Sequence, residues 1–342
     1  MLMRAIAIVE KLPLTDPRCF VAVELPKPAP GPNDLLVRVK AVSVNPVDYK
    51  VRQKRDPAAR EPRILGWDAA GVVEAVGPQV QLFRPGDEVF YAGDITLPGS
   101  NAEYQLVDAR IVARKPTGLS FEEAAALPLT AITAWEALFV RLNVPAETEL
   151  ESTRSTVLII GGAGGVGSIA IQIARRVAGL LVIATASRPE TADWCRSLGA
   201  DLVIDHRQPL LPQLKALNIG EVDYILCFNN TDQHWAGMAE AIKPQGRICS
   251  IVENEKPLEL GLLKNKSAGF IWEFMFTRSM FKTLDMIEQH RLLTRIAELV
   301  EQGIVRTTHT ETLGVLNPAN LARAHQRLEA GQTIGKLTLT VE

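Results

Sequence analysis

Two hydrophobic patterns divide this chain of 342 residues. In the first third, apolar and polar residues alternate, and the segment 35–44 places Leu35, Val37 and Val39 on one face. This period of two predicts half-buried strands in a small β-rich domain. Further short strands are predicted at 4–9, 71–76, 88–91 and 102–107. The proline-rich segment 26–32 excludes a helix or a central strand there.

From Thr156 onward, continuous apolar runs alternate with amphipathic segments. The runs predict strands at 156–160, 181–185, 202–204, 223–228 and 247–252. The amphipathic segments predict helices at 166–178, 190–198, 209–217 and 232–242. Such apolar strands are typical of a sheet that is buried on both faces. Alternating strand and helix units therefore predict an α/β fold with a parallel, doubly wound sheet.

The segments around this α/β region connect it to the first domain. Residues 121–141 are expected to form helices interrupted at Pro128, and a polar spacer follows at Pro145–Ser155. The pattern after Pro257 is mixed, with a long helix predicted at 284–302 and a terminal strand at 336–341. The end of the chain is expected to return to the first domain, and the length suits two domains.

The amino-acid composition excludes several classes of protein. Hydrophobic residues make up 47% of the chain and charged residues 22%, which suits a chain with a full core. The 37 basic and 39 acidic residues leave no global charge for nucleic acid or an anionic membrane. No uninterrupted apolar run reaches membrane-spanning length, and the N-terminus lacks the apolar region of a secretory signal. We therefore expect a cytoplasmic protein without nucleic-acid or membrane partners.

Cysteines and histidines give no metal-binding pattern. The four cysteines, at 19, 195, 227 and 249, are scattered without a CxxC pair, and the five histidines form no HExxH pair. We expect buried free thiols in a reducing compartment and no bound metal.

One glycine-rich segment predicts a phosphate-binding turn. It matches GxGxxG and reads Gly162-Ala163-Gly164-Gly165-Val166-Gly167. An apolar strand precedes it and an amphipathic helix follows, so a diphosphate would meet glycine backbone and the N–H groups of a helix N-terminus. The alternative is a tight turn without a ligand. We do not expect a P-loop, because no Gly-Lys-Ser/Thr closes the motif.

The end of the second α/β strand indicates which nicotinamide cofactor binds. An acidic residue there would accept a hydrogen bond from the ribose of NAD. The sequence instead has Ser187 and Arg188, and arginine can pair with a 2′-phosphate. We therefore expect NADPH as the cofactor. The alternative is that Arg188 is an ordinary solvated residue at a helix start.

Motifs in the first domain point to a known family. They are Asn45-Pro46-Val47-Asp48, Gly66-Trp67-Asp68-Ala69-Ala70-Gly71, Gly86-Asp87 and the segment 127–135. With the glycine-rich turn, this order resembles the medium-chain dehydrogenase/reductase superfamily along essentially the whole chain, above all its zinc-free quinone oxidoreductase branch. The resemblance implies a GroES-like catalytic domain at 1–128 and 276–342, and a Rossmann NADPH-binding domain at 129–275.

The resemblance also implies that zinc is missing. Zinc enzymes of this superfamily place Cys, His-Glu and Cys around a catalytic metal, and the matching positions here are Asn45, Trp67-Asp68 and Leu129. A single carboxylate does not replace three protein ligands. The four cysteines of the structural zinc lobe are also absent from residues 91–110.

Without a Lewis acid, the reaction should use an acceptor that already delocalises charge. We therefore expect NADPH-dependent hydride transfer to a quinone or an α,β-unsaturated carbonyl. By resemblance, Asn45, Tyr49 and Thr133 lie near the nicotinamide. Tyr49 is then the candidate proton donor or oxygen-binding group, or else a packing residue. Asn45 either binds substrate or fixes the loop before Pro46, Thr133 positions cofactor or loop, and water is the alternative proton source.

Three further features are candidates for binding. His206 follows the third strand, where related reductases place a residue beside the adenosine; the alternative is an exposed histidine. Asn229 follows the fourth strand, where ligands bind in such sheets; the alternative is a turn that caps the next helix. The aromatic segment 270–276 is either a buried edge, a wall of the substrate cleft or a homodimer contact, and we expect the dimer.

Two other functions stay open. One is a zinc-independent reductase of another carbonyl or of an acyl thioester, although no basic cluster for a carrier stands out. The other is a non-catalytic NADPH-binding sensor. A zinc alcohol dehydrogenase is the least favoured alternative.

Overall fold

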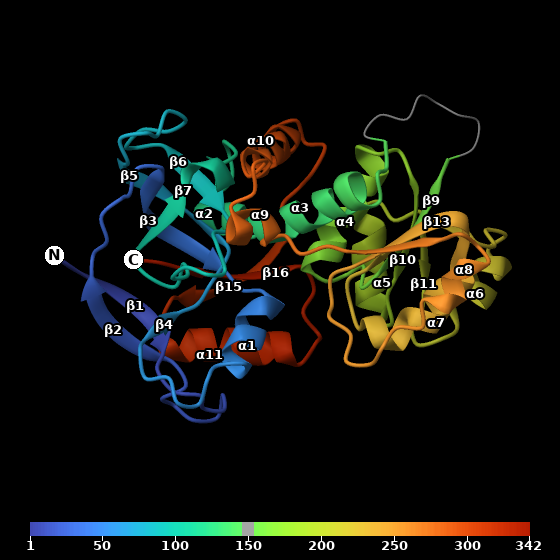
Figure 1. Cartoon of the computed structure of the whole chain (residues 1–342), viewed down its shortest axis with the longest axis horizontal. Coiled ribbons are helices and arrows are strands. Elements are labelled where there is room, and N and C mark those ends of the chain that lie inside the picture. Colours follow the sequence, from blue (N-terminus) through green and yellow to red (C-terminus); the bar gives the residue numbers. More distant parts are fainter. Residues whose placement is uncertain (146–153) are drawn as a thin grey trace. The chain divides into compact units, whose positions relative to one another are not determined.

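The computed structural model describes residues 1–145 and 154–342, so most of the predicted spacer Pro145–Ser155 lies outside the described residues. The chain divides into two compact units (Figure 1). The first contains Met1–Ile132 and Phe276–Glu342, and the second contains Thr133–Met275. The division falls four residues after the predicted boundary at 128, and within those four residues the N–H of Leu129 donates to Asp68 of the first unit (2.9 Å).

The second unit is built on one parallel sheet of six strands in the order β11-β10-β9-β12-β13-β14. Its strands are β9 (Thr156–Ile160), β10 (Leu181–Thr185), β11 (Leu202–Ile204), β12 (Val222–Cys227), β13 (Ile242–Ser250) and β14 (Gly269–Trp272). This order is that of a dinucleotide-binding Rossmann sheet, and it confirms the predicted doubly wound topology.

Helices connect these strands in alternation, as predicted. They are α4 (Gly165–Arg176), α5 (Pro189–Leu198), α6 (Leu210–Ala216), α7 (Thr231–Ala241) and α8 (Gly261–Lys264). The unit begins within α3 (Pro128–Trp135), which continues into a π-helical turn, η2 (Glu136–Arg141). Strand β9 is buried at every position, and side chains such as Leu158, Ile225 and Met238 form the core beneath α6 and α7.

The first unit is rich in β-structure, as predicted. A three-stranded sheet has the order β2-β1-β4, formed by Val21–Pro26, Leu2–Ile8 and Arg63–Ile64. Strand β2 is at its edge and ends at Pro26, which agrees with the exclusion of a central strand there. A seven-stranded sheet has the order β15-β16-β3-β5-β6-β8, with β7 paired to β3. Among its described pairs, β15 and β16 run parallel and the others are antiparallel.

The bounds of the seven strands are β3 (Asp34–Ser43), β5 (Ala69–Val76), β6 (Glu88–Tyr91), β7 (Tyr104–Asp108), β8 (Val112–Arg114), β15 (His309–Val315) and β16 (Lys336–Thr340). The helices of this unit are α1 (Pro46–Gln53), η1 (Ala109–Ile111), α2 (Phe121–Ala125), α9 (Thr277–Phe281), α10 (Ile287–Glu301) and α11 (Pro318–Glu329). The C-terminal segment therefore returns to the first unit and adds β16 beside β3 (Figure 1).

One helical stretch among the described residues, Phe121–Arg141, is long and apolar enough to cross a bilayer by length and composition. This stretch is not an uninterrupted apolar run, because it contains Pro128, Glu136 and two threonines. In its most apolar window, 72% is buried inside the protein, as for a helix in a protein core.

Candidate functional site

The glycine-rich segment forms a turn between β9 and α4. The N–H of Gly161 donates to Thr185 Oγ1 (3.1 Å) and that of Gly162 to the Thr185 carbonyl (3.2 Å), which fixes the turn to the end of β10. Helix α4 begins at Gly165. Its first-turn N–H groups, including those of Gly165 and Val166, have no carbonyl four residues earlier within the helix. They are the donors that a diphosphate would need.

Glycine is needed in this turn for two different physical reasons, which apply at different positions. A Cβ on Gly167 would lie 2.2 Å from the Gly161 carbonyl oxygen, and one on Gly162 would lie 2.9 Å from Ala184 Cβ. Packing alone therefore requires glycine at these two positions. A Cβ on Gly164 would meet only the Gly161 oxygen, at an ordinary 3.5 Å, and Gly164 has φ −71°. Packing does not explain Gly164, whereas close approach of a ligand does. The turn thus fits a dinucleotide.

The residues that follow β10 are those predicted to determine whether NADPH or NADH binds. Ser187 and Arg188 are both partly buried, and Arg188 precedes the first residue of α5. The Arg188 guanidinium forms an ion pair with Glu190 (3.0 Å), a residue that is more than half exposed. An exposed pair of this kind contributes little stability. Exchange of Glu190 for a 2′-phosphate is therefore chemically accessible to Arg188.

His206, beyond β11, is half-buried rather than exposed. Its ring lies edge-on to His234 of α7, with ring centroids 6.2 Å apart. Burial lowers the pKa of His206, and burial followed by the neighbouring His206 lowers the pKa of His234 to about 4. Nδ1 of His206 and Nε2 of His234 have no hydrogen-bond partner within the described residues. Sequence reasoning missed His234, because a single histidine in a helix carries no signal of its neighbours.

Asn229, beyond β12, is exposed, and its Cβ lies 3.4 Å from the position of a Cβ on Gly161. It therefore sits beside the glycine-rich turn. The next residue, Asn230, caps α7 by accepting from the Gln233 N–H (3.1 Å). The capping alternative from the sequence is thus present in this loop.

In the first unit, Asn45 belongs to a buried polar network. Its amide Oδ1 accepts from Lys336 Nζ (2.6 Å), and its Nδ2 donates to Asp68 Oδ2 (2.9 Å). Lys336 Nζ lies 3.0 Å from the same Asp68 oxygen, and the other Asp68 oxygen accepts from the Leu129 N–H. Asn45, Asp68 and Lys336 are at most 3% exposed. Both polar atoms of the Asn45 amide are engaged, which favours the loop-fixing alternative for this residue.

Asp48 and Tyr49 follow Asn45 on α1. The Asp48 carboxylate accepts from the Asn45 N–H (2.7 Å). Burial raises the pKa of Asp48 to about 7, against the opposing effects of that N–H and of Lys336. Tyr49 is partly buried, and burial, with a smaller contribution from Glu329, raises the pKa of its phenol. Tyr49 therefore keeps its proton at neutral pH. The remaining candidate, Thr133, is buried in α3 and is the first residue of the second unit.

The residues at the zinc positions do not fit a zinc ion. Trp67 is fully buried, and its Nε1 donates to the Asp94 carbonyl (3.1 Å). Leu129 offers no ligand atom, and an ammonium group already pairs with Asp68. Within residues 1–145 and 154–342, no group of three His, Cys, Asp or Glu side chains is arranged to hold a metal. The four cysteines are buried free thiols, as predicted.

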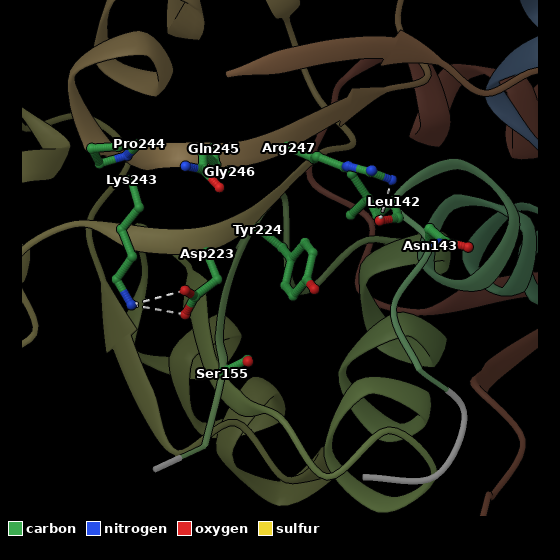
Figure 2. Close-up of a pocket in the computed structure, with 10 residues that line it drawn as sticks. All are labelled: Leu142, Asn143, Ser155, Asp223, Tyr224, Lys243, Pro244, Gln245, Gly246 and Arg247. Atoms are coloured by element: carbon green, nitrogen blue, oxygen red, sulfur yellow. Dashed lines mark hydrogen bonds and ion pairs between the residues drawn. The ribbon is translucent and has the colours of Figure 1, made fainter. Parts of the chain in front are cut away.

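A polar depression lies near the N-terminal ends of β9 and β12 (Figure 2), whereas the glycine-rich turn follows the C-terminal end of β9. Asp223 and Tyr224 at the start of β12 line it, together with Lys243 and Arg247 of β13. Lys243 Nζ contacts both Asp223 carboxylate oxygens at 2.9 Å. These two charges satisfy each other. Because the depression lies at the N-terminal ends of β9 and β12, it is not part of the candidate cofactor site.

Comparison with known proteins agrees with this geometry. The alcohol dehydrogenase GroES-like domain family matches residues 31–117, and the zinc-binding dehydrogenase family matches residues 198–339. A zinc-type alcohol dehydrogenase-like protein of Staphylococcus aureus is 48% identical over 342 residues, covering 99% of this chain and 100% of the relative. A 2-methylene-furan-3-one reductase of Solanum lycopersicum is 42% identical over 184 residues, covering 51% of this chain and 45% of that protein.

Solved structures share the fold over the whole chain. A Rhizobium etli protein provisionally named a zinc-dependent alcohol dehydrogenase has a TM-score of 0.94 and 52% identity, covering 99% of this chain and 98% of that one. The quinone oxidoreductase of Coxiella burnetii has a TM-score of 0.80 and 27% identity, covering 100% of both chains. These matches confirm the predicted combination of a GroES-like and a Rossmann domain.

The two kinds of glycine can be separated by substitution. Gly164→Ala should leave the melting temperature nearly unchanged but weaken binding of a nicotinamide cofactor, measured with NADPH, at least about tenfold, because the new methyl group would fill space that a diphosphate needs. Gly167→Ala should instead destabilise the protein, since its Cβ would collide with the Gly161 carbonyl. Calorimetric titration and thermal melts measure both effects. Unaltered NADPH affinity in Gly164→Ala would rule out close phosphate approach at this residue.

The buried Asp48 predicts a pH dependence of stability. Because its pKa rises from 3.8 to about 7 on folding, the folded chain binds more protons than the unfolded chain between these values. Asp48 should therefore stabilise the fold at low pH and lose this effect as pH rises through 7. Relative to Asp48→Asn, the wild-type free energy of unfolding should fall by up to about 4 kcal/mol between pH 4 and pH 8.

Urea unfolding of both proteins at several pH values measures this difference. Asp193→Asn, which removes an exposed carboxylate on α5, controls for general loss of charge. A pH-independent difference between Asp48→Asn and wild type would contradict the raised pKa of Asp48.

Proposed function

Since this chain belongs to the medium-chain dehydrogenase/reductase superfamily, we propose that it is an NADPH-dependent, zinc-independent reductase of quinones or α,β-unsaturated carbonyls. The observation that carries the proposal is the residue set at the family's zinc positions. Asn45, Trp67 and Leu129 supply no ligand set for zinc, and Asp68 is paired with an ammonium group. An acceptor that spreads its own negative charge has least need of a Lewis acid.

The cofactor assignment rests on the second unit. The glycine-rich turn and the first turn of α4 offer backbone N–H groups to a diphosphate. No carboxylate stands at the end of β10 to accept from a ribose hydroxyl, while Ser187 and Arg188 are available for a 2′-phosphate. His206, half-buried beyond β11, is the candidate residue beside the adenosine.

When bound, NADPH supplies the hydride that adds to the conjugated carbon of the acceptor. The protein's part is to bind and orient both partners and to stabilise the charge that develops on the carbonyl oxygen. Tyr49, which keeps its proton at neutral pH, is the candidate donor to that oxygen. Asn45 acts by holding the start of α1, and Thr133 is proposed to position cofactor or loop. Water is the alternative source of the final proton.

Names of similar proteins support this choice of acceptor. The tomato relative is named for a ketone that carries a conjugated methylene group, and the Coxiella structure is named a quinone oxidoreductase. The alternatives are reduction of another carbonyl or acyl thioester, and NADPH sensing without turnover. Each of these functions would use Arg188 and the glycine-rich turn in the same way. Only a test with different acceptors therefore distinguishes them.

We also propose that the chain forms a homodimer through β14. This strand is the last in the sheet order and pairs with β13 on one side. Ile271, Trp272 and Phe274 are 39%, 41% and 44% exposed, so the strand end presents apolar side chains to solvent. An edge strand of this kind readily pairs with the same strand of a second copy.

The proposed activity is measured as NADPH oxidation by metal-stripped protein with a panel of quinones, enones, simple ketones and acyl thioesters. Turnover should occur with the conjugated acceptors, persist in chelator and be much weaker with NADH. Arg188→Gln should raise the KM for NADPH about 10- to 100-fold while leaving the KM for NADH unchanged, because only NADPH carries the 2′-phosphate. Arg196→Gln, on the helix that begins after Arg188 and paired with Asp193, is the matched control.

Tight NADPH binding without turnover on the whole panel would replace this proposal by the sensor alternative. Turnover with simple ketones alone would replace the conjugated acceptor. Equal loss of NADPH and NADH use in Arg188→Gln would remove the role of Arg188.

The dimer is tested by light scattering during gel filtration. Wild type should elute at twice the chain mass, and Ile271→Lys should elute as a monomer because a charge on the edge strand opposes pairing. Leu262→Lys changes another exposed apolar residue of the same unit and should leave the dimer intact. A monomeric wild type, or a dimeric Ile271→Lys, would contradict pairing through β14.

A further inference from the structure

Lys336 is a buried lysine with three oxygen acceptors. Its Nζ donates to the Val44 carbonyl (2.8 Å) and to Asn45 Oδ1 (2.6 Å), and it pairs with Asp68 Oδ2 (3.0 Å). The residue is 3% exposed and begins β16. An ammonium group has three N–H donors, so this set of acceptors uses all of them.

The carboxylate that faces Lys336 is equally enclosed. Asp68 is 0% exposed, and its two oxygens accept from the Leu129 N–H, from Asn45 Nδ2 and from Lys336. Each of these groups donates, which is the pattern around an ionised carboxylate. A buried charge without such partners would be strongly unfavourable.

The network therefore joins four segments that are distant in sequence. They are the residues before α1, the residues before β5, the N-terminus of α3 and the start of β16. The first three contain the positions that match the zinc ligands of metal-dependent relatives, namely Asn45, Trp67-Asp68 and Leu129. The fourth contributes the cation.

We propose that the Lys336 ammonium is a built-in cation that replaces zinc as the positive centre holding these segments together. The lysine supplies charge and three N–H donors from within the chain, so the segments meet without a metal. Its three donors are all used, so Lys336 is a positioning residue rather than a group that contacts substrate. The inference concerns the first unit alone and does not depend on which acceptor the proposed reductase uses.

Removal and chemical replacement of the ammonium test this inference. Lys336→Ala deletes the equivalent of propylammonium and should lower the melting temperature by more than about 5 °C, because Asp68 stays buried without its cation. Propylammonium chloride should restore at least about half of that loss by binding in the vacated space. Tetramethylammonium chloride has the same charge but no N–H donor and should restore none of it.

Wild type and Lys27→Ala, each melted in the same two salts, are the controls. Lys27 belongs to the same unit, and its partner Glu74 is 38% exposed, so water already solvates the carboxylate that loses its lysine. Neither control should respond differently to the two salts. If Lys336→Ala does not fold, its refolding yield in each salt replaces the melting temperature as the readout.

The double variant Asp68→Asn/Lys336→Met tests the pair in a second way. It removes both buried charges, so it should melt at a higher temperature than Lys336→Met alone. A Lys336→Ala protein with the melting temperature of wild type, or one that both salts stabilise equally, would overturn the proposal. These readouts use no turnover, so failure of the proposed reductase activity would be seen separately.

Discussion

The packing of the first unit depends on how the chain stabilises one buried carboxylate, that of Asp68. Asp68 has no contact with solvent and lies among segments that the chain brings together from four places. Burial raises the pKa of such a group, and Lys336, Asn45 and the Leu129 N–H oppose that effect. Because these donors surround Asp68, they also fix the loop before α1, the start of α3 and the start of β16. The arrangement gives the protein a positive centre made of side-chain atoms, and it leaves no ligand set for zinc.

The second unit obeys a different constraint, the close approach of backbone segments. Gly162 and Gly167 are needed so that β9, β10 and α4 can meet, whatever the ligand. A Cβ on Gly164 would make only an ordinary contact with the Gly161 oxygen, so close approach of a diphosphate is the reason we give for this glycine. The fold and its proposed cofactor therefore use neighbouring glycines for separate purposes. Arg188 extends the same site, because its present partner Glu190 is exposed and easily exchanged.

Much of the second unit could be predicted from the sequence. The bounds of β9, β10 and β11 agree with the prediction, because buried apolar runs end at glycine or polar residues. Strand β13 begins five residues earlier than predicted, at Ile242, because Pro244, Gln245 and Gly246 suggest a turn. The structure accommodates them by a register shift against β12, and Gln245 adopts φ 65°.

The candidate site could be predicted only in part. Local motifs identify the glycine-rich turn, Ser187 and Arg188, since a strand, a turn and a helix follow one another in the chain. The contacts of Lys336 and His234 could not be predicted, because their partners lie far away in the sequence. Asn45 was identified by its motif, but its engagement with Asp68 and Lys336 appears only in three dimensions.

The central claim is that hydride goes to a conjugated carbon without the help of zinc. The most direct test is to incubate metal-stripped protein with an enone and NADPH deuterated at C4, using each C4 stereoisomer in turn. Nuclear magnetic resonance of the product then locates the deuterium. The account predicts deuterium on the carbon β to the carbonyl group. Deuterium on the carbonyl carbon, or a reaction that requires added zinc, would contradict it.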